Sequence, residues 1–292
     1  MHSKKGWTLA LFADVHSGHP FALHPDTPTI LPDEESIVPN KWQLLEWEFW
    51  LKSWDIVADL RRGRQLIVCH DGDAIEGIHH GTTQLMTMRK DVQERIHYRC
   101  VQSALDRVSF RQGHDRLFYV TGTEPHVGPG SSTEERIARS LLGIKPDDNS
   151  VGSYVKKRLL LRIGGNLISI AHHGPGRGAR NWLRGNNLRW FLRSYYLDCL
   201  EAKTEMPRYV IRSHRHQLDR AEVRDKEQRL ISEAFTLPGW QLKTEFVYRL
   251  NPDGVSEIGM LVIQIDPDGS SEWIPLVMPV QQDEEEVIKI DQ

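Results

Sequence analysis

The sequence predicts an α/β sandwich in which two β-sheets pack together and helices lie on the outside. In the first half of the chain, apolar strand-like runs alternate with amphipathic helical patterns. In the second half, short strand-like runs follow one another between turn residues, which is typical of a sheet-rich part of the same sandwich. The chain has 292 residues, of which 39% are hydrophobic and 26% charged, enough apolar material for a sizeable core.

The first half contains three predicted strands and three predicted helices. The strands are 7–13, 65–69 and 116–120, and the helices are 41–62, 91–112 and 132–143. Each helical pattern stops at or before a glycine, a common helix terminator. The third helix begins with Ser132-Thr-Glu-Glu135, which matches a capping box. The proline-rich and acidic stretch 18–40 predicts a long irregular loop.

The second half begins with a predicted β-hairpin, in which residues 154–163 and 166–171 flank Gly164-Gly165. A helix rich in arginine and aromatic residues is expected over 179–203, and a strand over 209–212. Residues 220–280 are expected to form short strands, and the acidic end, 282–292, a frayed tail. No stretch has the composition of a linker, so residues 1–292 are expected to form one domain.

Bulk composition excludes several classes of protein. The net charge of −3 gives no global basic field of the kind that advertises nucleic-acid binding, although a local basic patch is compatible with it. Three cysteines without CxxC spacing argue against a disulfide framework or a zinc ribbon and favour a reducing compartment, so we expect a cytoplasmic protein. No signal peptide is visible, and no apolar run reaches the ~18 residues that span a bilayer.

Five predicted strands each end in Asp, Glu or His. The segments are Asp14-Val-His16, Gly72-Asp-Ala-Ile-Glu76, Gly122-Thr-Glu-Pro-His126, His172-His-Gly174 and His214-Arg-His216. Residues two apart on an extended chain point the same way, so the first and last pairs can each aim both side chains at one point. Loops at strand ends are where α/β folds place functional groups. The pattern predicts a metal site that is assembled by the fold.

This ordered set resembles the calcineurin-like metallophosphoesterases, which show D-x-H, G-D-x-x-D/E, G-N-H-D/E, H and G-H-x-H in that order. The resemblance covers Asp14 to His216 and implies a four-layer αββα sandwich with two mixed β-sheets around a dinuclear metal site. The segments Gly122–Gly128 and Pro238-Gly-Trp-Gln241 resemble phage- or prophage-encoded members of the family. The last motif begins with Ser213 in place of glycine, and serine is small enough to substitute for it.

The resemblance implies that Asp14, His16 and His216 bind the first metal and that Asp73 bridges both metals. Mixed carboxylate and imidazole ligands suit transition metals better than calcium. We expect two divalent ions, with manganese favoured over iron, zinc, nickel and magnesium. The final residue of the second motif, Glu76, is open to a structural or a catalytic role.

His173 and His214 would bind the second metal. His172 and His173 are adjacent and would point to opposite faces of a strand, so one of them is expected to be the ligand. His173 is favoured because it precedes Gly174, as in the family.

The third motif departs from the family pattern. Aligning on Gly122 puts Thr123 at the position of the family's ligand asparagine and Glu124 at that of its catalytic histidine. Aligning on His126 instead puts Pro125, which has no donor atom, at the asparagine position. We therefore expect His126 to be the catalytic, phosphate-facing acid, and Glu124 or Thr123 to fill the ligand position.

Five arginines without an intervening acidic residue follow the fourth motif: Arg177, Arg180, Arg184, Arg189 and Arg193. Two tryptophans lie among them. The functional interpretation is a surface that tracks phosphates beside the active site, with Arg177, Arg180 and Arg184 binding substrate. The alternative is a solvated basic helix face with the tryptophans packed in the core.

Taken together, the motifs predict a metal-dependent phosphoesterase that hydrolyses phosphodiester bonds by attack of a metal-activated hydroxide. The arginine-rich stretch and the phage-type resemblance favour nucleic acid as the substrate, hence a nuclease-like enzyme. One alternative is a nucleotide or small-molecule phosphomonoesterase. Another is a metal-stabilised binding protein that has lost turnover through its altered third motif. The sequence leaves the oligomeric state open.

Overall fold

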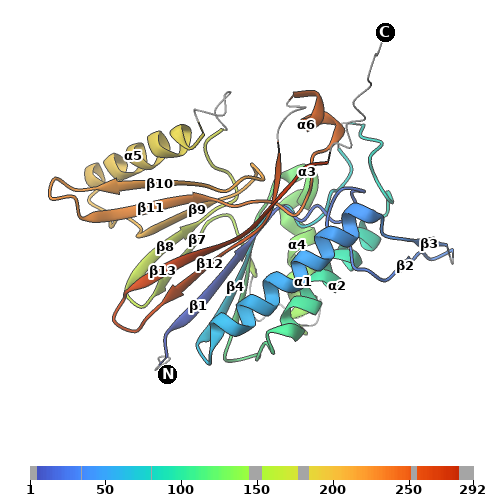
Figure 1. Cartoon of the computed structure of the whole chain (residues 1–292), viewed down its shortest axis with the longest axis horizontal. Helices are drawn as coiled ribbons and strands as arrows, with labels where there is room; N and C mark the ends of the chain where they lie inside the picture. Colours follow the sequence, from blue (N-terminus) through green and yellow to red (C-terminus); the bar gives the residue numbers. More distant parts are fainter. Residues whose placement is uncertain are drawn as a thin grey trace, which may run out of the picture.

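Two β-sheets pack face to face, with helices on both outer faces (Figure 1). The computed structural model describes residues 5–33, 35–79, 81–144, 153–176, 184–250 and 255–282. In chain order, the strands are β1 (Trp7–Phe12), β2 (Thr29–Ile30), β3 (Ser36–Ile37), β4 (Gln65–Asp71), β5 (Arg116–Val120), β6 (Val155–Lys156), β7 (Leu159–Ile163), β8 (Asn166–Ile170), β9 (Tyr209–Arg212), β10 (Asp219–Arg224), β11 (Leu230–Thr236), β12 (Ser256–Ile265) and β13 (Ser271–Val280). The helices are α1 (Lys41–Arg61), α2 (Lys90–Arg107), α3 (Glu124–Val127), the 3₁₀ turn η1 (Pro129–Ser131), α4 (Ser132–Leu141), α5 (Asn186–Glu201) and α6 (Glu245–Leu250).

The first sheet has the order β13-β12-β1-β4-β5-β6. β1, β4, β5 and β6 run parallel, whereas β12 pairs antiparallel with β1. Both faces of β1 are buried because apolar side chains occupy every position after Trp7 except Thr8. Leu9 and Leu11 pack toward the second sheet, whereas Ala10 and Phe12 pack under the helices with Trp50 of α1.

The second sheet has the order β10-β11-β9-β8-β7 and is also mixed. Its inner face meets the first sheet through residues such as Ile168 and Ile211. Its outer face is covered by α5, whose Leu188 and Leu192 pack on Val210 (Figure 1). Apolar interfaces therefore lie between the first helices and the first sheet, between the two sheets, and between the second sheet and α5. The predicted αββα sandwich with two mixed sheets is confirmed.

Local signals explain both ends of α1, but the predicted start of α4 needs a correction. Asn40 and Gln43 form a capping box at the start of α1, and the helix ends with Arg62 in the left-handed conformation before a glycine. The capping box predicted at Ser132 is wrong, because Ser131 is the N-cap and makes no side-chain capping bond. Glu135 instead accepts hydrogen bonds from the segment that leads into β6.

Several predicted boundaries also change. The helix predicted over 91–112 ends at Arg107, and the following loop folds back so that the N–H of Arg111 donates to Asp115. The strand predicted over 154–163 divides in two: β6 joins the first sheet and β7 the second, so the chain crosses between the sheets there. The short helix α6 was not predicted, and the expected tail beyond 282 lies outside the described residues.

Among the described residues, no helix has both the length and the apolar character that a membrane span requires. All three cysteines are buried and free: Cys69, Cys100 and Cys199.

Candidate metal centre

The five predicted segments meet at one end of the sandwich, after β1, β4 and β5 of the first sheet and after β8 and β9 of the second. Backbone hydrogen bonds join neighbouring segments within each sheet. The N–H of Asp14 donates to the carbonyl of Gly72, and the N–H of Ser213 donates to that of His172. A metal bound here would therefore draw ligands from both sheets.

The side chains of the Asp14/His16 and His214/His216 pairs do not converge by strand alternation, as their two-residue spacing suggested. Five of the predicted ligands have positive φ angles between 45° and 69° and are therefore not extended: Asp14, His16, Asp73, His214 and His216. Non-glycine residues rarely adopt this conformation, and it concentrates at functional sites where the surroundings enforce it. Each loop thus turns sharply beyond its strand, and the turn, not strand alternation, aims the side chains inward.

The first ligand cluster contains Asp14, His16 and His216. Asp14 Oδ1 lies 3.9 Å from His16 Nε2 and 3.4 Å from His216 Nε2. Asp14 Oδ1 and His16 Nε2 are buried and have no hydrogen-bond partner within the described chain. Leaving such a group unsatisfied costs ~1–3 kcal/mol, and a cation between the two atoms would remove that cost. The residues fit a metal ion here.

The second cluster joins Asp14 and Asp73 to His172 and His214. Asp73 Oδ2 lies 3.0 Å from His172 Nε2, 3.7 Å from His214 Nδ1 and 3.9 Å from His16 Nε2. Asp73 therefore faces both clusters, as a bridging ligand must. Asp14 Oδ1 does so as well, because it lies 3.9 Å from His172 Nε2.

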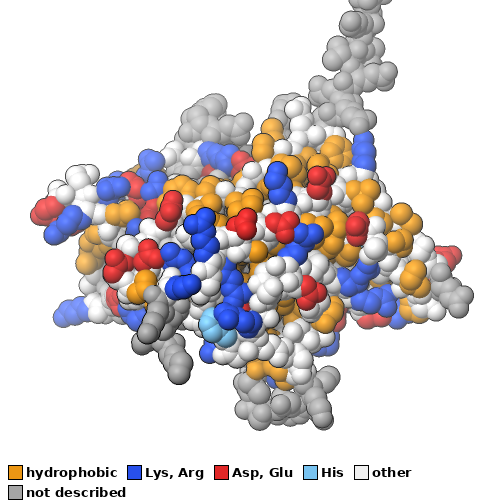
Figure 2. Space-filling model, turned by 60° about the horizontal axis from the view of Figure 1, so that its bottom comes forward, with side chains coloured by type: hydrophobic (Ala, Val, Ile, Leu, Met, Phe, Trp, Pro, Cys, Tyr) orange, Lys and Arg blue, Asp and Glu red, His pale blue; other side chains and the backbone are white. Residues whose placement is uncertain are grey.

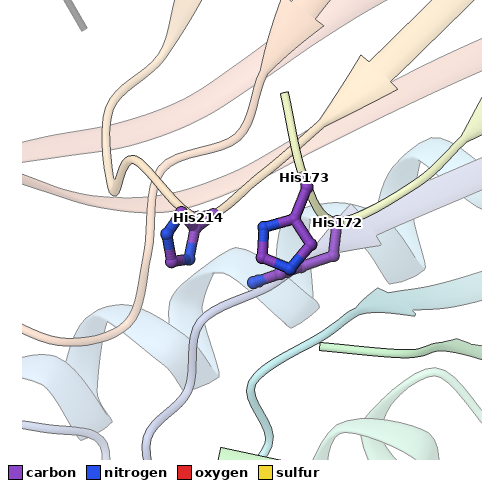
Figure 3. Close-up of side chains that lie close together, drawn as sticks. All are labelled: His172, His173 and His214. Atoms are coloured by element: carbon purple, nitrogen blue, oxygen red, sulfur yellow. The ribbon is translucent and has the colours of Figure 1, made fainter. Parts of the chain in front are cut away.

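His172, rather than the favoured His173, lies closest to Asp73. Figure 3 shows His172 and His173 on the segment after β8, opposite His214. His173 is exposed, and its ring centroid lies 4.9 Å from that of His214, so it remains within reach of the same ion. His172 and His173 do not lie on opposite faces of a strand, because β8 ends before them, at Ile170. His173 as a ligand stays a prediction, and His172 is the residue that the sequence reasoning passed over.

Electrostatics keep the carboxylates of the site ionised. Burial alone would raise the pKa of Asp73, but the charge and hydrogen bond of His172 outweigh it and hold that pKa well below its ordinary value. Burial would likewise raise the pKa of Asp14, and His216 reverses the effect. Burial would lower the pKa of His172, but Asp73 raises it to about 10. Ionised carboxylates beside imidazoles are the donor set that a divalent transition metal prefers.

The structure separates the two candidates for the altered third motif. Thr123 Oγ1 lies 3.2 Å from Asp73 Oδ2, 3.3 Å from His214 Nδ1 and 3.4 Å from His172 Nε2, within the second cluster. Its N–H donates to Asp73 Oδ1 at 2.5 Å. Glu124 is exposed and forms no part of either cluster. Of the two candidates, Thr123 therefore lies beside the second cluster, and its role as a ligand stays a prediction.

His126 lies beside the first cluster, with its ring centroid 4.5 Å from that of His16. Its Nδ1–H donates to the carbonyl of Glu76 at 2.6 Å, which leaves Nε2 facing the site. Burial, with a contribution from His16, lowers the pKa of His126 to about 4. The ring is thus neutral at pH 7, and the predicted role as an acid requires an anionic substrate nearby to restore its proton.

Glu76 fixes the orientation of His16. Its Oε2 accepts hydrogen bonds from His16 Nδ1 and Gln241 Nε2, both at 3.0 Å, and its Oε1 accepts one from His79. Holding Nδ1–H in this way leaves His16 Nε2 free to bind a metal, a common arrangement of metal-ligating histidines. Glu76 is therefore placed to orient a predicted ligand.

A sixth segment, after β11, supports the site and was not predicted as part of it. Besides Gln241, it contributes Gly239. A Cβ at Gly239 would lie 2.8 Å from the ring of His216 and 3.2 Å from Asp14 Cβ, so glycine allows this close approach. The Pro238-Gly239 turn was visible in the sequence, but its distance along the chain from the motifs gave no sign of this contact.

The predicted substrate arginines have different outcomes. Arg177 and Arg180 lie outside the described residues. Arg184 binds two carboxylates, with its Nε 2.6 Å from Asp219 and its Nη1 2.8 Å from Glu257, so protein partners occupy its guanidinium.

The molecule has four layers of helices and sheets. Acidic and imidazole side chains lie together at the strand ends, in the chain order of the five predicted segments. This is the arrangement that the resemblance to the calcineurin-like metallophosphoesterases implied. No protein-family model matches the chain, and no curated protein does.

Among solved structures, Vacuolar Protein Sorting 29 from Cryptosporidium parvum is 12% identical, with a TM-score of 0.36 over 94% of this chain and 100% of that one. A predicted phosphoesterase from Streptococcus pneumoniae is 9% identical, with a TM-score of 0.32 over 92% and 97%. A Thermotoga maritima protein solved by NMR is 11% identical, with a TM-score of 0.30 over 92% and 97%. These likenesses are weak, and the interpretation of the site rests on the layers and side chains described above.

Proposed function

We propose that this protein is a dinuclear metal-dependent phosphoesterase of the calcineurin-like superfamily that hydrolyses phosphodiester bonds in nucleic acid. The observation that carries the proposal is the pair of ligand clusters that share Asp14 and are both faced by Asp73, with buried ligand atoms that lack a protein partner. Two divalent ions bound there, with manganese favoured, would polarise a phosphoryl group and supply hydroxide at neutral pH.

The protein's own residues would orient a ligand carboxylate and move one proton. The hydroxyl of Thr123 lies beside the second cluster and donates to Asp73 Oδ2 at 3.2 Å, which helps to hold that carboxylate in place. His126 presents Nε2 to the same space, because its Nδ1 is held by Glu76. A phosphate diester that enters brings negative charge, which raises the pKa of His126 and favours a proton on Nε2. That proton would then pass to the leaving oxygen.

The nucleic-acid part of the proposal is supported by the surface of α5. Arg189, Trp190 and Arg193 are exposed, and the Arg193 guanidinium lies 5.5 Å from the Trp190 ring centroid. Exposed arginine and tryptophan offer charge for phosphates and a face for base stacking. Figure 2 shows basic side chains gathered around an exposed histidine on one face of the molecule.

An assay with four substrates tests the proposal: bis-p-nitrophenyl phosphate, p-nitrophenyl phosphate, and labelled single- and double-stranded DNA. Hydrolysis of the diester and of DNA by manganese-loaded protein, lost in Asp73→Asn, is the expected result. A preference for the monoester would instead support a phosphomonoesterase. Metal binding without turnover on any substrate would support a metal-stabilised binding protein.

His126→Ala tests the acid. We expect turnover of the diester to fall while the bound metal stays nearly unchanged, because His126 is assigned to the leaving group. Loss of both metals from this variant would make His126 a ligand and remove the assignment. The enzyme would work in the cytoplasm, a location supported by three buried cysteines that are all free.

A further inference from the structure

A small hollow lies at the N-terminus of α5, and the proposed mechanism does not use it. Three parts of the chain line it: Pro175 and Gly176 after the fourth motif, the first turn of α5, and the segment that includes Arg215 and Gln217. Arg215 lies between the predicted ligands His214 and His216 in the sequence. The hollow and the metal centre therefore share the segment that follows β9.

The N-terminus of α5 gives the hollow a positive partial charge. The N-cap is Gly185, which has no side chain with which to cap the helix, and the first turn contains no acidic residue. The first N–H groups of a helix have no partner within the helix, and a helix of this length adds its dipole to them. Such an end attracts a phosphate when another group helps to hold it.

Arg215 supplies a full positive charge. Its side chain is exposed, and it forms no ion pair and no hydrogen bond with any residue that the structure describes. The guanidinium lies over the turn after the fourth motif, since a Cβ at Gly176 would lie 3.6 Å from Arg215 Nη2.

Gln217 is the independent sign of a ligand. The residue is only 7% exposed, yet its Oε1 has no hydrogen-bond partner in the described part of the chain. A buried amide without a partner costs ~1–3 kcal/mol, so an unpaired one is a reason to look for a ligand. Its amide group can rotate, so that an N–H donates to a phosphate oxygen or the oxygen accepts from a sugar hydroxyl.

One acidic residue also lines the hollow and would oppose an anion. The carboxylate of Asp219 is paired with Arg184, at 2.6 Å between Oδ1 and Nε. Its charge is therefore offset within the protein, and Arg215 remains the uncompensated charge at this point.

We propose that the hollow is a second phosphate subsite, which binds a phosphate of the substrate next to the one that is hydrolysed. The inference rests on the proposed function and narrows it: the preferred substrate carries at least two phosphates in a chain, as an oligonucleotide does. A simple monoester cannot fill both positions.

Dinucleotides test the subsite. The substrates are thymidylyl-thymidine and its forms with an added 5′ or 3′ phosphate. The variants are Arg215→Gln and the control Arg229→Gln, an exposed arginine between β10 and β11 that does not line the hollow. A charge-assisted contact gives roughly a 10- to 100-fold effect. Wild type should prefer one phosphorylated form at least tenfold in kcat/KM. The preference should fall to about one in Arg215→Gln and persist in Arg229→Gln. Equal preference in all three proteins would overturn the subsite.

Binding of the same dinucleotides to metal-free protein separates the two proposals. We expect the preferred phosphorylated form to bind, and its Kd to rise about tenfold in Arg215→Gln and in Gln217→Leu. If wild type cleaves nothing but binding depends on Arg215, the proposed function fails and the subsite stands. If wild type cleaves every dinucleotide alike and binding ignores Arg215, the subsite fails and the function stands.

Discussion

Addition of manganese to metal-free protein should raise its thermal unfolding midpoint. The ligands come from both sheets, and Asp14 Oδ1 and His16 Nε2 are buried without a partner, so only the folded chain presents the site. A ligand at 100 times its Kd stabilises the folded state by ~2.7 kcal/mol. Unfolding entropy scales as roughly 2.1 cal/mol/K per residue, hence about 0.6 kcal/mol/K for this chain, and the expected shift is about 4 °C.

The assay is differential scanning fluorimetry across a manganese titration, with bound metal measured on the same samples. Asp73→Asn should lose most of the shift, because this carboxylate faces both ligand clusters. Glu124→Gln is the matched control and should keep the full shift, because Glu124 is exposed outside the clusters. A midpoint that stays constant while metal is bound, or an Asp73→Asn protein that shifts as much as wild type, would refute the reasoning.

Three further predictions concern support of the fold and the site. Burial lowers the pKa of His97 to about 3, so as the pH falls below about 6.5 a proton binds to this histidine in the unfolded chain before it does in the folded one. The free energy of unfolding should therefore drop by roughly 2 kcal/mol between pH 7 and pH 5. Denaturant unfolding of His97→Phe should show a flatter pH dependence than wild type, and an unchanged pH dependence would contradict this prediction. Gly239→Ala should weaken manganese binding tenfold or more by displacing the His216 ring, as the Kd will show, and an unaltered Kd would contradict the contact. Arg61→Met should cost roughly 2–3 kcal/mol, because it removes the guanidinium that pairs with the buried Asp115 carboxylate at 2.7 Å, while backbone donors to that carboxylate remain. Asp115→Asn in the same protein should restore part of the loss by removing the unpaired charge. Equal stability of the single variant and wild type would contradict this pairing.

The parts of the fold that follow from sequence periodicity were predictable. β5 and β9 have the predicted bounds, because short apolar runs between polar turns identify buried strands. Helix α6 was missed, since its six residues are too few to show a period. The end of α2 was misplaced because a tertiary contact of Asp115, invisible in the local pattern, turns the chain there.

For the site, the order of motifs predicted which segments would meet, but not how their atoms would lie. The positive φ angles at Asp14 and Asp73 depend on hydrogen bonds between loops that are far apart in the chain. The nearness of His172 to Asp73 depends on where β8 stops. Gly239 belongs to the site only because β11 lies beside β9. Each of these is a property of the assembled fold.

The antiparallel pairing of β1 with β12 has a consequence for how this protein is made. β1 leaves the ribosome long before β12 does. One edge of an apolar strand therefore stays unpaired until β12 has been synthesised, and pairings so distant in sequence form slowly. Nascent chains with open strand edges aggregate readily. Chaperone protection during synthesis should accordingly govern the yield of this protein more than its final stability does.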